Sequence, residues 1–104
     1  MSDFVNAVSA TNKACITNGA NIVTGGTGIA DVTIPTPSPG HACTIRVASL
    51  ASGSVVVTCT NGTFDGTNNT ATFDAANEAL SLVYNGSTAW AIALNVGGVA
   101  LSAV

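Results

Sequence analysis

The sequence predicts an all-β fold, namely a compact antiparallel sandwich or barrel of the jelly-roll type. Short β-branched runs alternate between two side-chain environments, and Gly, Asn and Pro separate these runs. No helix-length segment lies between the runs, which excludes βαβ units. With 104 residues, the chain is expected to form one domain.

The N-terminal segment differs from the rest of the chain. Phe4, Val5 and Val8 have helix-like spacing, and the Ser and Asp before them could cap a short helix. An extended arm is the alternative. We therefore expect an N-terminal arm or helix over residues 1–13 and a β domain over residues 14–104.

Nine short runs within the β domain have the composition of strands, because they are rich in β-branched residues and bounded by turn residues. These runs are Ala14–Thr17, Ala20–Thr24, Ile29–Ile34, Cys43–Ala48, Ser54–Thr60, Thr70–Asp74, Ala79–Tyr84, Thr88–Val96 and Val99–Ala103. Between the seventh and eighth runs, Asn85-Gly86 is typical of a type I′ hairpin turn.

The eighth run has two unlike faces. One is predicted to be core and carries Trp90, Ile92, Leu94 and Val96. The other carries Ala89, Ala91 and Ala93. A face of alanines is neither polar nor bulky, so it suits the close approach of another strand or subunit.

The segment from Pro35 to Gly40 has prolines at alternate positions and must be irregular, because proline fixes φ and cannot donate to a ladder. It is either a stiff loop or a contact loop against a neighbouring subunit. On the second interpretation Pro35, Pro37 and Pro39 join the three alanines as a subunit interface.

Charge is scarce and limits the possible functions. Charged residues make up 7% of the chain, against about 25% in an ordinary domain. Lys13 and Arg46 are the only strong cations and the net charge is −3, so nucleic-acid binding and polybasic membrane attachment are not expected. A surface with so little charge favours a subunit that is partly covered by copies or partners, and a very neutral monomer is the alternative.

No apolar run approaches the 20 residues of a membrane helix. The first residues lack the basic and apolar regions of a signal peptide, so we expect synthesis in a reducing cytosol. The three cysteines, Cys15, Cys43 and Cys59, are then expected to be free thiols that fill the core.

Catalytic and metal sites are not expected. His41 is the only histidine, and the usual zinc-ligand spacing of cysteines is missing. Asp65, Asn68 and Asn69 could offer oxygens to calcium, but carboxylates are sparse there. We therefore expect no enzyme activity, no metal and no cofactor.

Two further motifs have ordinary structural explanations. Gly25-Gly26-Thr27-Gly28 lacks the Lys-Ser/Thr of a phosphate loop and is expected to be a turn. Trp90 and Tyr84 could stack on a sugar, but the alternation around Trp90 favours a core position.

The stretch from Ala75 to Trp90 has a small-residue turn, an alternating apolar strand, Asn-Gly and a Trp. It resembles a hairpin of tailed-bacteriophage virion proteins, and Ile29–Pro35 followed by Pro39-Gly40 resembles a second step of the same proteins. The family is that of the small capsid decoration proteins, also called cement or head-fibre proteins.

This resemblance implies a homotrimer that stabilises the outside of a capsid, with the major capsid protein as partner. The protein would be made in the host bacterial cytoplasm and reside on the virion surface. No catalytic residues come with the family. A tail-fibre or receptor-binding module and a carbohydrate-binding, lectin-like domain remain alternatives.

Overall fold

The structure is a computed structural model that describes residues 5–84, 86 and 88–104. Within these residues every regular element is a strand. The strands are β1 (Val5–Val8), β2 (Gly19–Gly25), β3 (Ile29–Ile34), β4 (Ala42–Leu50), β5 (Val55–Cys59), β6 (Thr70–Phe73), β7 (Ala79–Tyr84), β8 (Trp90–Val96) and β9 (Ala100–Ser102).

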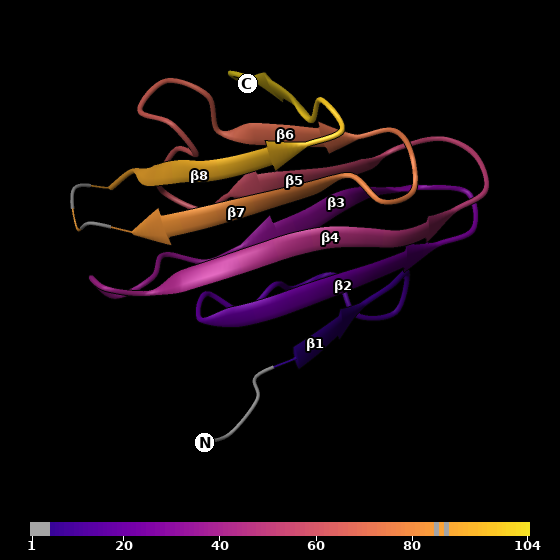
Figure 1. The fold of residues 1–104 in the computed structure, drawn as a ribbon, viewed down its shortest axis with the longest axis horizontal. Helices are drawn as coiled ribbons and strands as arrows, with labels where there is room; N and C mark the ends of the chain where they lie inside the picture. Colours follow the sequence, from indigo (N-terminus) through magenta and orange to yellow (C-terminus); the bar gives the residue numbers. More distant parts are fainter. Residues whose placement is uncertain (1–4, 85, 87) are drawn as a thin grey trace.

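The strands form two sheets that lie face to face (Figure 1). The five-stranded sheet has the order β1-β2-β4-β7-β8, and the four-stranded sheet has the order β3-β5-β6-β9. This sandwich confirms the predicted all-β class. The sheets do not close into a barrel.

The N-terminal half of the chain coils from one sheet to the other. After β2 the chain crosses to β3, returns to β4 and crosses again to β5. Each return brings the new strand beside an earlier strand of the same direction. Consequently β2 pairs parallel with β4, β3 pairs parallel with β5, and β1 adds one more parallel strand beside β2.

The C-terminal half is antiparallel. Here β7 pairs with β4 and β8, and β6 pairs with β5 and β9. Both sheets are therefore mixed, and the expectation of a wholly antiparallel sandwich is wrong for the N-terminal half. Period-2 alternation identifies a strand and its inward face, but it carries no information about the direction of the neighbouring strand.

The two turns that lead into β3 and β5 each contain a glycine, and their backbones lie in close contact. Gly28 precedes β3 and Gly53 lies shortly before β5, with φ values of +93° and +76°. A Cβ atom on Gly53 would lie 2.5 Å from the carbonyl oxygen of Thr27. The turns also share a backbone hydrogen bond of 3.0 Å from the N–H of Ile29 to the oxygen of Ser54. Both the φ value and the close backbone approach therefore require glycine.

The N-terminal segment is extended where the structure describes it. Val5–Val8 is an edge strand, so the short-helix alternative is wrong for these residues. Val8 is fully buried, which shows that the strand contributes to the core rather than standing apart from it. The start of the expected arm, residues 1–4, lies outside the described residues.

The first predicted run of the β domain, Ala14–Thr17, is not a strand. It forms a single parallel bridge from Ala14 to Thr33 of β3. The N–H of Cys15 donates to the oxygen of Thr33 over 2.8 Å, and the N–H of Thr33 donates to the oxygen of Lys13 over 2.9 Å. The segment thus follows the edge of the four-stranded sheet for only a few residues.

The last long strand, β8, changes face at a bulge. Its register against β7 shifts by one residue near Ala93. Trp90 is buried, whereas Leu94 and Val96 are 56% and 42% exposed. The prediction that Leu94 and Val96 share the core face of Trp90 is therefore wrong, because one extra residue reverses the period-2 pattern.

Side chains from both sheets fill the core. The largest fully buried ones are Phe64, Phe73, Ile34, Ile45, Leu80 and Leu82. Near one end of the core, Tyr84 and Trp90 meet edge to face with ring centroids 5.4 Å apart. Their strands, β7 and β8, pair as the predicted hairpin, although Asn85 of the predicted turn lies outside the described residues.

Candidate interaction face

The outward side of the five-stranded sheet is mostly apolar. We call it the apolar face and define it by its larger side chains, which are Val5, Ile22, Val83, Leu94 and Val96, with alanines between them. Val5 and Val83 are 66% and 44% exposed. With Leu94 and Val96, they are four of the five large apolar side chains that are exposed within the described residues. Exposed apolar side chains gathered on one sheet face are typical of an interaction surface.

Three polar side chains on this face, Thr44, Arg46 and Ser81, have partners within the chain. The hydroxyls of Thr44 and Ser81 lie opposite each other on β4 and β7 and are hydrogen bonded at 3.3 Å. Arg46 is the one charged residue in the five strands, and its Nη2 donates to the Oδ1 of Asn77 over 2.9 Å. These groups therefore need fewer water molecules than isolated polar side chains would.

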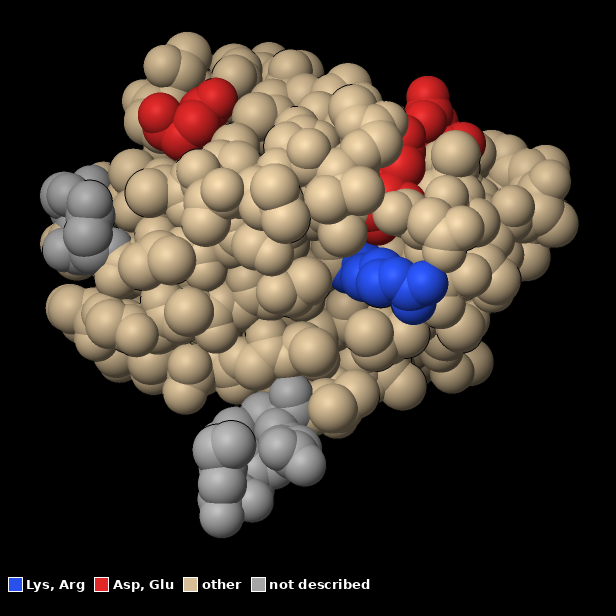
Figure 2. Space-filling view, viewed as in Figure 1, with Lys and Arg blue, Asp and Glu red and all other residues tan. Residues whose placement is uncertain are grey.

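Seen from this side, the molecule shows a broad area without charge (Figure 2). Basic side chains appear as one small patch, and acidic side chains lie near the upper rim and extend on the right down to that patch. A shallow hollow on the same face is lined in part by Ala20, Ala42, Val83 and Ala93. Small side chains make this part of the sheet accessible to the surface of another molecule.

The outward side of the four-stranded sheet has a different character. Its exposed and half-buried positions include Thr33, Thr58, Thr72 and Ser102. Hydroxyls of this kind remain hydrated without adding charge. The two sides of the sandwich are thus chemically distinct, with one rich in hydroxyls and the other in Ala, Val and Leu.

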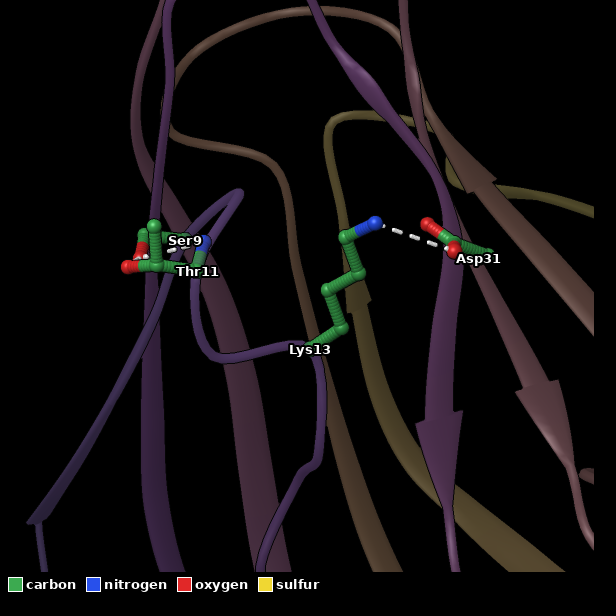
Figure 3. A network of polar contacts seen from close by, with 4 residues as sticks. All are labelled: Ser9, Thr11, Lys13 and Asp31. Atoms are coloured by element: carbon green, nitrogen blue, oxygen red, sulfur yellow. Dashed lines mark hydrogen bonds and ion pairs between the residues drawn. The ribbon is translucent and has the colours of Figure 1, made fainter.

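A charged pair lies at the edge of the hydroxyl-rich side. Lys13 Nζ and Asp31 Oδ2 are 3.1 Å apart, and both side chains are largely exposed. In the preceding turn, the hydroxyls of Ser9 and Thr11 are hydrogen bonded at 3.1 Å (Figure 3). Exposed pairs such as Lys13–Asp31 add little stability. We therefore regard this pair as part of the solvated surface at the edge of the four-stranded sheet.

The structure separates the six residues that the sequence predicts as a subunit interface. Ala91 and Ala93 are exposed and lie on the apolar face. Ala89 is half-buried and forms a parallel bridge with Thr63 of the same chain. Of these alanines, therefore, two remain available to another molecule, whereas a segment of the chain itself already approaches Ala89.

The three prolines lie between β3 and β4, near the end of β7, and Pro35 and Pro37 line a small hollow with Tyr84 and Trp90. Pro35 and Pro39 are exposed and Pro37 is half-buried. The loop is fixed to β7 by a hydrogen bond of 3.0 Å from the N–H of Gly40 to the oxygen of Tyr84. It is thus a loop held against the end of β7 by hydrogen bonding.

The cysteines are buried free thiols. Burial raises the pKa of Cys15, Cys43 and Cys59 to about 12 in each case. A thiol with so high a pKa is a poor nucleophile at neutral pH.

The only histidine, His41, forms a hydrogen bond with a hydroxyl group. Its Nδ1 and the hydroxyl of Thr17 are hydrogen bonded at 2.9 Å.

Asp65 organises its own loop. Its carboxylate accepts hydrogen bonds from the backbone N–H groups of Thr67 and Asn68 and from the side-chain amide of Asn68, at 2.8–3.0 Å. These bonds hold the pKa of Asp65 below its usual value. In the part of the chain that the structure describes, no group of three or more His, Cys, Asp or Glu side chains is arranged to hold a metal ion.

The aromatic pair lies in the core, which confirms the position that the alternation of β8 predicted for Trp90. Tyr84 and Trp90 are 6% and 4% exposed, so neither ring face is free to stack on a sugar. The hollow beside them has a volume of about 10 Å³, which is room for about one water molecule. The carbohydrate-binding alternative therefore loses the two side chains on which it was based.

One polar cluster, centred on Asn21, was not expected from the sequence. This side chain is fully buried and bonds to Ile16, Thr44 and Asn6. A signal for it was present, because Asn21 stands two positions before Val23 and therefore shares the inward face of the strand. A polar residue at an inward position predicts a buried hydrogen-bonded group.

Among the described residues there is no helix long and apolar enough to cross a membrane. In comparisons with protein-family models, with curated proteins and with solved structures, the chain matches none.

Proposed function

We propose that this chain is a non-catalytic structural subunit that decorates and stabilises the outside of a bacteriophage capsid as a homotrimer. The observation that carries the association is the apolar face, where Val83, Leu94 and Val96 are exposed together on neighbouring strands. A side with these residues and so little charge is stable in water mainly when other protein covers it.

The capsid assignment is based on the resemblance of the segment from Ala75 to Trp90 to virion hairpins. Two structural features agree with it. The strands of this segment, β7 and β8, form the expected hairpin, and its aromatic residue, Trp90, is a core side chain rather than a ligand contact. The partner is then the major capsid protein, and the location is the outer surface of the virion.

Decoration would stabilise the capsid by mass action. A subunit that binds the closed shell and not its dissociated parts shifts the equilibrium toward the shell. The rigidity of the chain suits this role, because the apolar face belongs to a sheet and is not made of loops. Little conformational entropy is then lost when it docks.

Capsid binding can be tested with particles of a phage whose genome encodes this chain. Particles made without the chain are mixed with the purified protein, separated by sedimentation and heated. We expect the protein to sediment with the particles in a fixed ratio and to raise their disassembly temperature. A chain found on the tail fibres of complete particles, and absent from the capsid, would overturn the proposal in favour of the tail-fibre alternative.

A further inference from the structure

We infer that the apolar face is the surface through which copies of this chain pack against one another. This inference rests on the proposed function insofar as that function requires a homo-oligomer. It goes further by assigning the contact to the outward side of β1-β2-β4-β7-β8, and it excludes the hydroxyl-rich side and the proline loop as the main contact.

The bulge in β8 is the first evidence. A regular strand would place Leu94 and Val96 in the core, but the register shift turns both toward the outside, where they are 56% and 42% exposed. A bulge that re-aims side chains is typically a specific structural feature of a sheet. Here it adds two large apolar side chains to a face that already carries Val83.

Charge supports a second copy as the occupant. Two identical faces repel each other if the face has a strong net charge, and they do not if it is neutral. The five strands carry one charged residue, Arg46, and it is bonded to Asn77. A face with a single positive charge gives little electrostatic preference for a strongly charged partner, and one such charge causes little repulsion between two copies.

The size of the face is sufficient for a stable contact. Five strands about 4.8 Å apart and about 22 Å long give a flat area of about 500 Å². Covering two such faces removes about 1,000 Å², which reaches the lower limit for a specific interface. This figure applies to two copies packed face to face; around a three-fold axis each face would be divided between two neighbours, so a trimer would cover about 1,500 Å² in total and about 500 Å² at each of its three contacts.

The chain itself offers a matched pair of test positions. Ala91 is exposed on the apolar face, and Ala100 is exposed on β9, at the edge of the other sheet. Both are strand residues with the same side chain, so Ala91→Glu and Ala100→Glu add the same carboxylate to opposite sides. Light scattering at micromolar concentration, with circular dichroism to verify folding, compares the two variants with the unchanged protein.

We expect the unchanged protein and Ala100→Glu to be oligomeric and Ala91→Glu to be monomeric. An Ala91→Glu variant that stays oligomeric, or an Ala100→Glu variant that dissociates in its place, would overturn the assignment of the face and leave the homo-oligomer intact. A monomeric unchanged protein would overturn both. An oligomer that dissociates as expected, but does not bind capsids, would leave the face assigned and remove the capsid function.

A second measurement avoids any effect of the glutamate on folding. Leu94→Cys and Ala100→Cys place a new thiol on each side, while the three native thiols are buried. We expect a maleimide to label Cys at position 100 at least tenfold faster than Cys at position 94 in the oligomer. Equal labelling rates would show that the apolar face is open and would contradict the inference.

Discussion

Asn6 and Asn21 stand opposite each other in the parallel pair β1–β2, and the Nδ2 of Asn6 donates a hydrogen bond to the Oδ1 of Asn21 over 3.1 Å. Asn21 makes all four hydrogen bonds that a side-chain amide can form. Its Oδ1 also accepts from the N–H of Ile16 at 2.8 Å, and its Nδ2 donates to the oxygens of Ile16 at 3.0 Å and Thr44 at 3.4 Å. One side chain thus joins both neighbouring strands to the segment that crosses beside them.

We expect Asn21→Ala to lower the free energy of unfolding by about 2–4 kcal/mol, because it removes four hydrogen bonds of a fully buried amide and leaves the half-buried backbone groups of Ile16 without their partner. Urea denaturation followed by circular dichroism measures the loss. Asn18→Ala is the matched control, since Asn18 is exposed and accepts one long bond of 3.4 Å from Ala42. Equal losses in the two variants would contradict a special role for Asn21.

The sequence predicts the strands well and their arrangement poorly. Eight of the nine predicted runs overlap a strand, because alternation and turn residues are local signals. The parallel pairing of β2 with β4 depends on the crossing through β3. No local sequence pattern indicates that the chain crosses between the sheets, so the parallel direction of these strands could not be predicted.

The candidate face was predicted only in part for a similar reason. Alternation through Trp90 correctly gives the buried position of Trp90 and the exposed position of Ala91. The bulge then reverses the assignment of Leu94 and Val96. Their exposure depends on the register against β7, which is a tertiary property. The largest apolar side chains of the face were therefore expected in the core.

The contact between the turns that lead into β3 and β5 gives a steric prediction. We expect Gly53→Ala to cost about 2–4 kcal/mol, because the new Cβ requires both a left-handed φ and a shift of the Thr27 carbonyl. Thermal unfolding measures the loss. Gly66→Ala is the control: its φ of +96° is also left-handed, but a Cβ there would meet nothing within 4 Å. We expect the control to lose about 1–2 kcal/mol from φ strain alone, and equal losses would show that the two turns do not restrict each other.

Truncation of the only tryptophan tests the assignment of Trp90 to the core. Trp90→Ala is expected to cost about 3–5 kcal/mol, the usual range for a buried aromatic residue, because it leaves a cavity beside Tyr84. Chemical denaturation monitored by circular dichroism measures this loss, and a glycan array serves as the second readout. A variant that keeps its stability and loses binding to a glycan would restore the carbohydrate-binding alternative.

The buried thiols predict a loss of stability at alkaline pH. Burial raises the folded-state pKa of Cys15, Cys43 and Cys59 from 9.0 to about 12. Below pH 9 the thiols are protonated in both states and their contribution is fully present. Between pH 9 and 12 they ionise in the unfolded chain first, so the unfolded state is favoured, by up to about 1.4 kcal/mol per pH unit for each thiol.

Urea denaturation at pH 7.5, 9.5 and 10.5 measures this slope. Cys15→Val is the matched variant, because it keeps a small apolar side chain in the core and removes one titrating group. We expect its free energy of unfolding to fall less steeply above pH 9 than that of the unchanged protein, while the two fall equally below pH 9. If the slopes are the same above pH 9, then Cys15 ionises equally in both states and its thiol is not shielded from water in the folded protein.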